Sequence, residues 1–362
     1  MELLNKRILV CSHYSAPYAG NFIKSFLFLS KYVSEIAFVF PPETKERDWI
    51  KDIKHKVYFA SPVSPKNCQE LENIIQDFHP DIVHCNFEGY DIAAVQAVRH
   101  LDMKKHCKVV WQLHDPLSYI PHPIKALYQR FCFYRHYGYY GRFAHIFSVS
   151  EENVDFVHRF NKQPITFIPN GTDTERLHIT FERSRKPFIF LAFGGRNISK
   201  RIDLLIRAAQ LLHKQQEQNF EVWLTNGTDT QKVVREIVGN NFPSWLKIVE
   251  QQADVSKLYD RVSCFVSTSE HETFSYAICE ASISGLPVVQ SDIEPTMWNA
   301  GNPSTFVFHF PDIKNLAEQM KKVMEYDPAQ LEERCRKTSK TNFRKYSLET
   351  WATKVIDFYR SL

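Results

Sequence analysis

Short apolar runs alternate with amphipathic stretches along the first half of the chain. We predict strands at residues 7–11, 36–40, 56–60, 81–86, 108–114, 145–150 and 165–170. Helical periodicity occupies several of the intervals, most clearly at 21–33 and 91–101. Buried strands that alternate with amphipathic helices are typical of an α/β, doubly wound parallel sheet.

A second series of the same kind follows a charged, strandless stretch near Thr180, TFERSRKP, which we interpret as a linker. Its predicted strands are 188–194, 221–227, 246–251, 264–269 and 287–291, and 202–215 is a predicted helix. The sequence therefore predicts two Rossmann-like domains, 1–178 and 179–342, with parallel sheets facing across a cleft. Residues 343–362 include an amphipathic helix that must dock elsewhere. Ligands of open α/β sheets bind beyond the carboxyl ends of the strands, so residues just after strands are the candidates.

The stretch SEHETFSYAICEAS places two glutamates, Glu272 and Glu280, eight residues apart across the start of a predicted helix. We expect this helix to begin near 273–275 and to end at Gly285. Glutamate is almost never buried without a partner, so something polar should meet Glu280. Two carboxylates that flank the positive end of a helix suit the hydroxyls of a nucleotide sugar, with its phosphates at the helix N-terminus.

Cations and a histidine follow other predicted strands. Arg196 and Lys200 come after FIFLAF, beside Gly194 and Gly195, and could bind a diphosphate. Taken alone, this segment is better explained as a solvated basic loop. His114 follows KVVWQL, where a lone histidine is more often a structural residue.

The composition describes an ordinary globular protein, with 44% hydrophobic and 24% charged residues and a net charge of +4. No apolar run is long enough to span a membrane, and the first apolar run is too short for a signal peptide. The eight cysteines form no C-x-x-C pair and lie mostly in apolar stretches. We therefore expect buried free thiols, a cytoplasmic location and no metal site.

Residues 116–150 contain no Asp or Glu, and their arginines alternate with aromatic residues. Such a stretch suits anionic headgroups at the inner face of a membrane, or a phosphorylated acceptor. In the alternative interpretation, Phe131, Tyr134 and Tyr137 face the core while the arginines extend outward.

Seven segments, in order, resemble those of the retaining glycosyltransferases of family 4, which have the GT-B fold and an E-x7-E signature. They are PDIVHCN, VVWQLHD, FSVSEENV, IPNGTDTERL, GRNISKRIDLLIRA, ETFSYAICE and EASISGLPVVQSD. The resemblance covers almost the whole chain. The ending KYSLETWATKVIDFYRSL is also similar, and in that family such a helix crosses back to the first domain.

The resemblance implies roles for individual residues. Arg196 and Lys200 would neutralise the donor diphosphate, Glu272 would orient the transferred sugar, and His114 would approach that sugar from the first domain. Glu280 would hold the ribose, and Gln251 would lie near the base. The backbone amides of Phe274, Ser275 and Tyr276 would meet the phosphate and the sugar, and Gly20 of the first loop would lie close to the diphosphate. No protein base, metal or cofactor is implied.

The chain departs from the family pattern where glycines are usual. Ala19 precedes Gly20, Arg201 follows Lys200, and Thr273 and Ser275 flank Phe274. Such losses narrow the space in which the backbone approaches a substrate. The donor-sugar pocket is the part of the site that these changes affect.

The resulting hypothesis is a retaining hexosyltransferase of surface polysaccharide biosynthesis. It would use a nucleotide diphosphate sugar, with a UDP-sugar favoured, and a growing glycan, lipid-linked or otherwise membrane-held, as acceptor. Nucleic acid is not an expected partner. Two alternatives remain open, namely a nucleotide-sugar epimerase of similar fold and a non-catalytic GT-B scaffold subunit.

Overall fold

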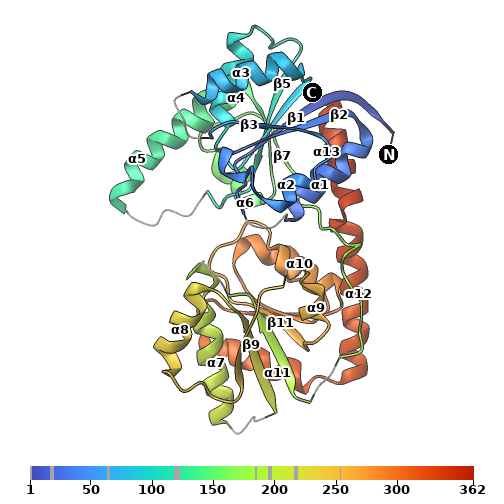
Figure 1. Cartoon of the computed structure of the whole chain (residues 1–362). Helices are drawn as coiled ribbons and strands as arrows, with labels where there is room; N and C mark the ends of the chain where they lie inside the picture. The colour runs from blue at the N-terminus through green and yellow to red at the C-terminus, as the bar shows by residue number, and fades with distance from the viewer. Residues whose placement is uncertain are drawn as a thin grey trace. The chain divides into compact units, whose positions relative to one another are not determined.

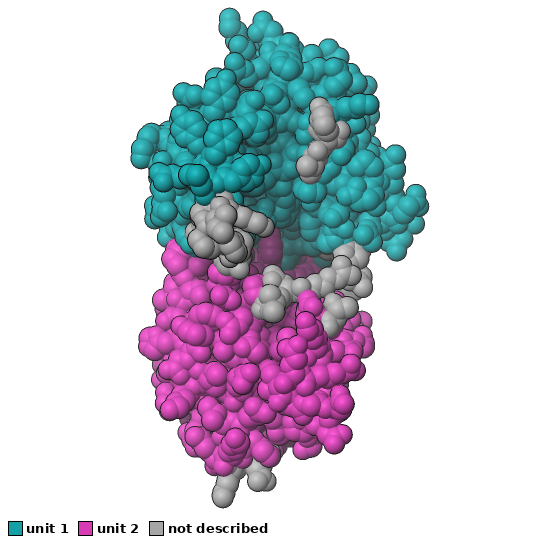
Figure 2. All heavy atoms as spheres, turned by 90° about the vertical axis from the view of Figure 1, so that its left-hand side faces the viewer, with its two compact units in different colours: residues 1–171, 348–362 teal, residues 172–347 magenta. Residues whose placement is uncertain are grey.

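The computed structural model describes residues 2–16, 20–62, 66–117, 123–183, 186–194, 198–215, 219–252 and 254–362. The chain divides into two compact units, coloured separately in Figure 2. Unit 1 consists of Met1–Gly171 and Leu348–Leu362, and unit 2 of Thr172–Ser347. The sequence predicted that the first domain ends at residue 178 and the second at residue 342, whereas the units change after Gly171 and after Ser347.

Unit 1 is built around a seven-stranded parallel sheet with the order β3-β2-β1-β4-β5-β6-β7 (Figure 1). Its strands are β1 (Leu4–Ser12), β2 (Val33–Phe40), β3 (Lys56–Phe59), β4 (Ile82–Asn86), β5 (Lys108–Leu113), β6 (His145–Ser148) and β7 (Ile165–Phe167). Its α-helices are α1 (Asn21–Leu29), α2 (Asp48–Lys51), α3 (Asn67–Phe78), α4 (Asp91–His100), α5 (Pro123–Phe133), α6 (Glu151–Val157) and α13 (Leu348–Arg360).

Both faces of this sheet are buried. On β1, Leu9 and Cys11 belong to the core beneath α3 and α4, whereas Ile8 and Val10 belong to the core beneath α1 and α13. A strand that is covered on both faces needs apolar residues at every position. This is why the strands of unit 1 read as continuous apolar runs in the sequence.

The C-terminal helix α13 is part of unit 1. Trp351 packs edge-on against Phe26 of α1, with ring centroids 5.4 Å apart. The hydroxyl oxygen of Tyr359 lies 2.5 Å from His84 Nδ1. Gly171 permits this packing, because a Cβ at that position would lie 2.6 Å from the Cβ of Trp351.

Unit 2 contains a six-stranded parallel sheet with the order β10-β9-β8-β11-β12-β13. Its strands are β8 (Phe188–Ala192), β9 (Phe220–Thr225), β10 (Leu246–Val249), β11 (Cys264–Ser267), β12 (Val288–Ser291) and β13 (Thr305–Phe308). Its α-helices are α7 (Ile202–Lys214), α8 (Thr228–Val238), α9 (Ser256–Tyr259), α10 (Tyr276–Ile283), α11 (Ile313–Glu325) and α12 (Pro328–Tyr346).

The predicted fold class, α/β with two parallel sheets, is confirmed. Every predicted strand has a counterpart, and among the described strands only β13 was not predicted. The stretch near Thr180 belongs to unit 2. There Arg183 donates hydrogen bonds to the carbonyl oxygens of Thr180, Tyr259 and Ser284.

Candidate active site

Lys200 and Glu272 form an ion pair at the carboxyl edge of the second sheet. Lys200 ends a short 3₁₀ helix (Ile198–Lys200) after β8, and Glu272 lies in the loop after β11. Lys200 Nζ donates to Glu272 Oε1 at 2.5 Å, and Ser269 Oγ donates to the same oxygen at 2.8 Å. The two predicted residues therefore meet in this structure, although they lie 72 positions apart in the chain.

Hydrogen bonds to backbone carbonyl oxygens hold the loops after β8 and β11 together. Thr268 Oγ1 donates to the carbonyl oxygen of Lys200 at 2.8 Å, and the Glu270 amide donates to Ser199 O at 2.8 Å. Gly194 follows β8 where a Cβ would lie 2.8 Å from Thr225 O, so the close approach of β9 requires glycine there. A small pocket at this edge is lined by Lys200, Glu272 and Ser275, among others.

Helix α10 begins at Tyr276, slightly later than predicted. Ser275 precedes it in the left-handed region, with φ of 63°, and this conformation breaks the helix on its N-terminal side. Only the second half of the spacing between Glu272 and Glu280 is therefore helical. The first-turn amides of α10 lie next to Ser275 in the chain, and the positive end of the helix dipole favours an anion there.

The side chain of Phe274 is part of the packed interior of unit 2. The ring is buried, stacks on Trp298 at 5.1 Å, and packs against Tyr276 and Tyr346. The Phe274 carbonyl accepts a hydrogen bond of 2.8 Å from the indole nitrogen of Trp298. This packing anchors the loop in front of α10, so any contact of Phe274 with a ligand would come from its backbone amide.

Glu280 is buried, at 4% exposure, and has a charged partner that the sequence analysis did not identify. Arg176 donates a hydrogen bond to Glu280 Oε1, and Tyr259 Oη lies 3.5 Å from Oε2. Burial, followed by the charge of Glu280, raises the pKa of Tyr259 well above its ordinary value. The expectation that something polar meets Glu280 is confirmed. Arg176 lies in the segment IPNGTDTERL, but the resemblance implied no role for it.

Two residues near this site keep a backbone conformation that favours glycine. Arg201 has φ of 46° and Ser275 has φ of 63°, and both stand where the sequence departs from glycine in the family pattern. Arg201 pairs with Asp203 at 2.9 Å and with Glu270 at 3.6 Å. Each residue therefore adds a side chain at a left-handed position where glycine would add none.

Two further predicted donor-site residues, Gln251 and Arg196, have no described contact with the Lys200–Glu272 pair. Gln251 is exposed, two residues after the end of β10. Arg196 lies outside the described residues. Among the residues of unit 2 that the structure describes, no three His, Cys, Asp or Glu side chains lie close enough to hold a metal ion.

His114 and Gly20 lie at the carboxyl edge of the first sheet. The His114 ring stacks on Phe87, with centroids 4.4 Å apart, and meets Phe22 edge-on at 5.6 Å. Its Nε2 lies 3.0 Å from Asn86 Oδ1, and burial lowers its pKa to about 3. Gly20 caps α1, the helix that carries Phe22. A neutral imidazole that is 9% exposed can present one edge to a ligand as a hydrogen-bonding group.

A polar pocket, here named the Glu88 pocket, opens in unit 1 beside β4 and β5. Its polar lining residues are His13, Asn67, Glu88, Gln96, Asp115, Arg135 and His136. Phe87 and Glu88 follow β4 with φ of 60° and 53°, an unusual pair of left-handed residues. Such strain is typically found at functional sites.

Hydrogen bonds hold the Glu88 pocket in place. Tyr137 donates to Glu88, and His136 Nε2 lies 3.0 Å from the buried carboxylate of Asp91. Although Asp115 as a whole residue is exposed, desolvation of its carboxyl group, together with the charge of Glu88, raises its pKa to about 6. Glu88 was not among the residues predicted from the sequence, where its only signal was its position just after a predicted strand.

An exposed aromatic face runs along α5 and the π-helix that follows it (Tyr134–Tyr139). Its large apolar side chains are Leu127, Tyr128, Phe131 and Tyr134, each more than 60% exposed. Arg130 and Arg135 are also exposed, whereas Tyr137 is buried. The core-facing interpretation is therefore wrong for Phe131 and Tyr134 and holds for Tyr137 alone. Among the described residues, no helix has the length and apolarity needed to cross a membrane.

Comparison with protein families matches both units of the chain. The model described as Glycosyltransferase Family 4 matches residues 34–176, and that described as Glycosyl transferases group 1 matches residues 173–342. The structure of Anabaena Alr3699/HepE in complex with UDP-glucose is similar over 99% of this chain and 100% of that one, with a TM-score of 0.80 and 15% identity. The chain is a glycosyltransferase with the GT-B fold.

Other relatives of this glycosyltransferase differ in their named activities. Sucrose-phosphate synthase from Thermosynechococcus elongatus has a TM-score of 0.78 and 14% identity over 99% of both chains. The GtfA subunit of a UDP-N-acetylglucosamine–peptide N-acetylglucosaminyltransferase from Streptococcus pneumoniae is 28% identical over 131 residues. That match covers 36% of this chain and 24% of the relative's length.

Replacing Arg176 with methionine should destabilise unit 2 by about 3–5 kcal/mol, because the Glu280 carboxylate would remain buried without its charged partner. Urea denaturation measures this loss. The double change Arg176→Met with Glu280→Gln should restore most of the stability, because it removes the buried carboxylate charge together with the arginine that balances it. Lys337→Met, which breaks an exposed ion pair with Glu333, is the matched control and should change stability by less than about 0.5 kcal/mol. A loss below about 1 kcal/mol for Arg176→Met would show that Glu280 does not depend on Arg176.

Proposed function

We propose that this glycosyltransferase retains anomeric configuration and transfers a hexose from a UDP-sugar to a hydroxyl of a growing glycan in surface polysaccharide biosynthesis. The observation that carries the proposal is the Lys200–Glu272 pair beside the start of α10. A cation, a helix N-terminus and an acceptor-only carboxylate are the groups that a diphosphate and an adjacent sugar require. Glu280, held by Arg176, would offer its carboxylate to the ribose.

The free protein satisfies these charges internally. Lys200 and Glu272 neutralise each other at 2.5 Å, so a diphosphate would compete with Glu272 for the ammonium group. Glu272 would then turn its oxygens to the sugar hydroxyls, while Ser269 still donates to it. As the glycosidic bond breaks, Lys200 and the predicted partner Arg196 would stabilise the negative charge that develops on the departing diphosphate.

The donor class draws support from the relatives. The Anabaena structure contains UDP-glucose, and the Streptococcus relative is named for transfer from UDP-N-acetylglucosamine. We therefore assign UDP as the nucleotide. Which sugar is transferred depends on hydrogen bonds to its individual hydroxyl groups, and the fold alone does not specify these bonds.

The Glu88 pocket is our candidate for the acceptor. Glu88 and Asp115 can accept hydrogen bonds from sugar hydroxyls, and Arg135 and His136 can donate to their oxygens. The exposed aromatic face of α5 lies next to Arg135 in the chain. Its arginines and aromatic rings suit the anionic surface of a membrane, so we propose a membrane-held acceptor and peripheral binding at the cytoplasmic face.

A thermal shift panel of UDP-, GDP-, ADP- and dTDP-sugars tests the donor proposal. UDP-glucose or UDP-N-acetylglucosamine should raise the melting temperature of the wild type by several degrees at saturation, because the ligand binds the native state. Lys200→Met should weaken this binding at least about tenfold, which corresponds to about 1.4 kcal/mol. Glu280→Gln should lose part of the shift for free UDP as well as for the sugars.

The matched control is Lys257→Met, which removes an exposed lysine of α9 and should leave the ligand-induced shift unchanged. Shifts are compared with each variant's own ligand-free value, because Glu280 also stabilises the fold. The donor assignment is contradicted if no UDP compound stabilises the wild type, or if Lys200→Met responds fully. An epimer formed from donor alone would support the epimerase alternative instead.

Sedimentation with vesicles tests the membrane proposal. The wild type should bind vesicles rich in anionic lipid and not neutral ones. The double change Leu127→Ser with Phe131→Ser should reduce binding at least about tenfold, because two exposed apolar side chains no longer enter the interface.

Phe343→Ser, which alters an exposed phenylalanine of α12, is the control and should bind like the wild type. Equal sedimentation of the wild type and the double variant would exclude this face as the membrane contact.

A further inference from the structure

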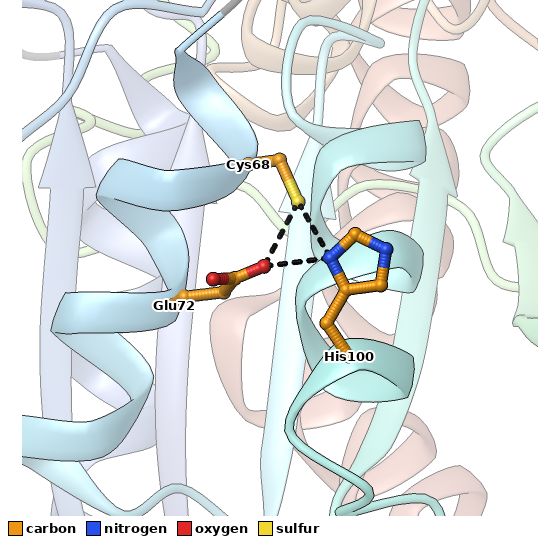
Figure 3. A group of neighbouring side chains, drawn as sticks. All are labelled: Cys68, Glu72 and His100. Carbon is orange, nitrogen blue, oxygen red and sulfur yellow. Dashed lines mark hydrogen bonds and ion pairs between the residues drawn. The ribbon is translucent and has the colours of Figure 1, made fainter.

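Three side chains of unit 1 converge on the surface between α3 and α4. Cys68 and Glu72 lie one turn apart on α3, and His100 is the last residue of α4. Figure 3 shows the thiol, one carboxylate oxygen and an imidazole nitrogen pointing toward one another. Neither the donor site nor the Glu88 pocket includes these residues.

The spacing of the three atoms resembles one face of a metal coordination tetrahedron. Sγ lies 3.4 Å from Glu72 Oε1 and 3.8 Å from His100 Nδ1, and these last two atoms are 2.8 Å apart. With zinc bonds of about 2.3 Å to sulfur and about 2.0–2.1 Å to nitrogen and oxygen, tetrahedral edges would be about 3.4–3.6 Å. Side-chain rotations that move each atom by a few tenths of an ångström would reach that geometry.

The chemistry of the three groups also favours one kind of ion. Thiolate and imidazole together with a single carboxylate select a borderline metal such as Zn²⁺ over Mg²⁺ or Ca²⁺, which prefer oxygen ligands. One thiolate and one carboxylate would balance the two charges of the ion. His100 is largely exposed, so water can occupy a fourth position.

Without a metal, the cluster is held by hydrogen bonds. Desolvation and the neighbouring Glu72 raise the pKa of the Cys68 thiol to about 11, so it remains protonated and donates to Glu72. A bound ion would take the place of that proton, with sulfur, oxygen and Nδ1 as ligands and the imidazole proton on Nε2. One proton would leave for each zinc ion bound.

We propose that Cys68, Glu72 and His100 form a surface zinc site that clips α3 to the end of α4. The two helices cover the same face of the first sheet, and the site would fix them where α4 ends. The three ligands do not line the Glu88 pocket, and this inference does not rest on the proposed donor or acceptor. The expectation of no metal came from the absence of C-x-x-C spacing, which cannot reveal ligands supplied by two helices.

Metal binding to the full chain, first stripped with a chelator, tests the site. Titration calorimetry with ZnCl₂ should show one ion bound for each chain, and Zn²⁺ should raise the melting temperature. Co²⁺ should produce a thiolate-to-cobalt charge-transfer band in the near ultraviolet, which reports the sulfur ligand directly. Cys68→Ser and His100→Gln should each weaken zinc binding at least about tenfold, and Cys68→Ser should abolish the band.

Cys132→Ser is the matched control, because Cys132 is also half-buried in unit 1 but has no place in the cluster. It should bind zinc and cobalt like the wild type. Circular dichroism of the metal-free variants shows whether each still folds. The proposal is overturned if the wild type binds no zinc at one ion per chain, or if folded Cys68→Ser and His100→Gln bind it as tightly as the wild type.

Discussion

The buried carboxylate of Glu280 constrains the packing of unit 2, because it needs a polar partner in the interior. Glu280 lies inside α10 with almost no exposure, and such a charge is tolerated only with a partner. Arg176 provides that partner from the segment that enters unit 2, and Tyr259 closes the other side. The Arg176–Glu280 pair holds α10 in position. The position of α10 determines how far its N-terminus lies from Lys200 and Glu272. The donor site that we propose therefore depends on an interaction behind it.

In unit 1, too, interactions in the interior hold the residues of a candidate site in place. The left-handed turn at Phe87 and Glu88 would cost free energy in isolation. Tyr137 holds Glu88 in place, and His136 holds Asp91 on the adjoining helix. Phe87 also stacks on His114. The strained turn thus positions the predicted histidine and the polar pocket together.

Much of the fold could be predicted because strands covered on both faces must be apolar throughout. The strand β13 was missed although its residues, TFVF, favour a strand and β10, β11 and β12 have the same length. The start of α10 was placed too early because periodicity does not reveal a left-handed residue such as Ser275. Glu272 and Glu280 were found through their spacing, but their partners Lys200 and Arg176 lie far away in the chain. Such pairs follow from tertiary packing, which a local pattern does not contain.

The central claim is that the Lys200–Glu272 pair and the start of α10 form the site for a nucleotide diphosphate sugar. A crystal structure of the chain with UDP bound tests this most directly. The account predicts the diphosphate at the N-terminus of α10, within hydrogen-bond distance of Lys200 Nζ, with the ribose hydroxyls on the Glu280 carboxylate. UDP bound elsewhere, with Lys200 still paired to Glu272 and no ligand at α10, would contradict it.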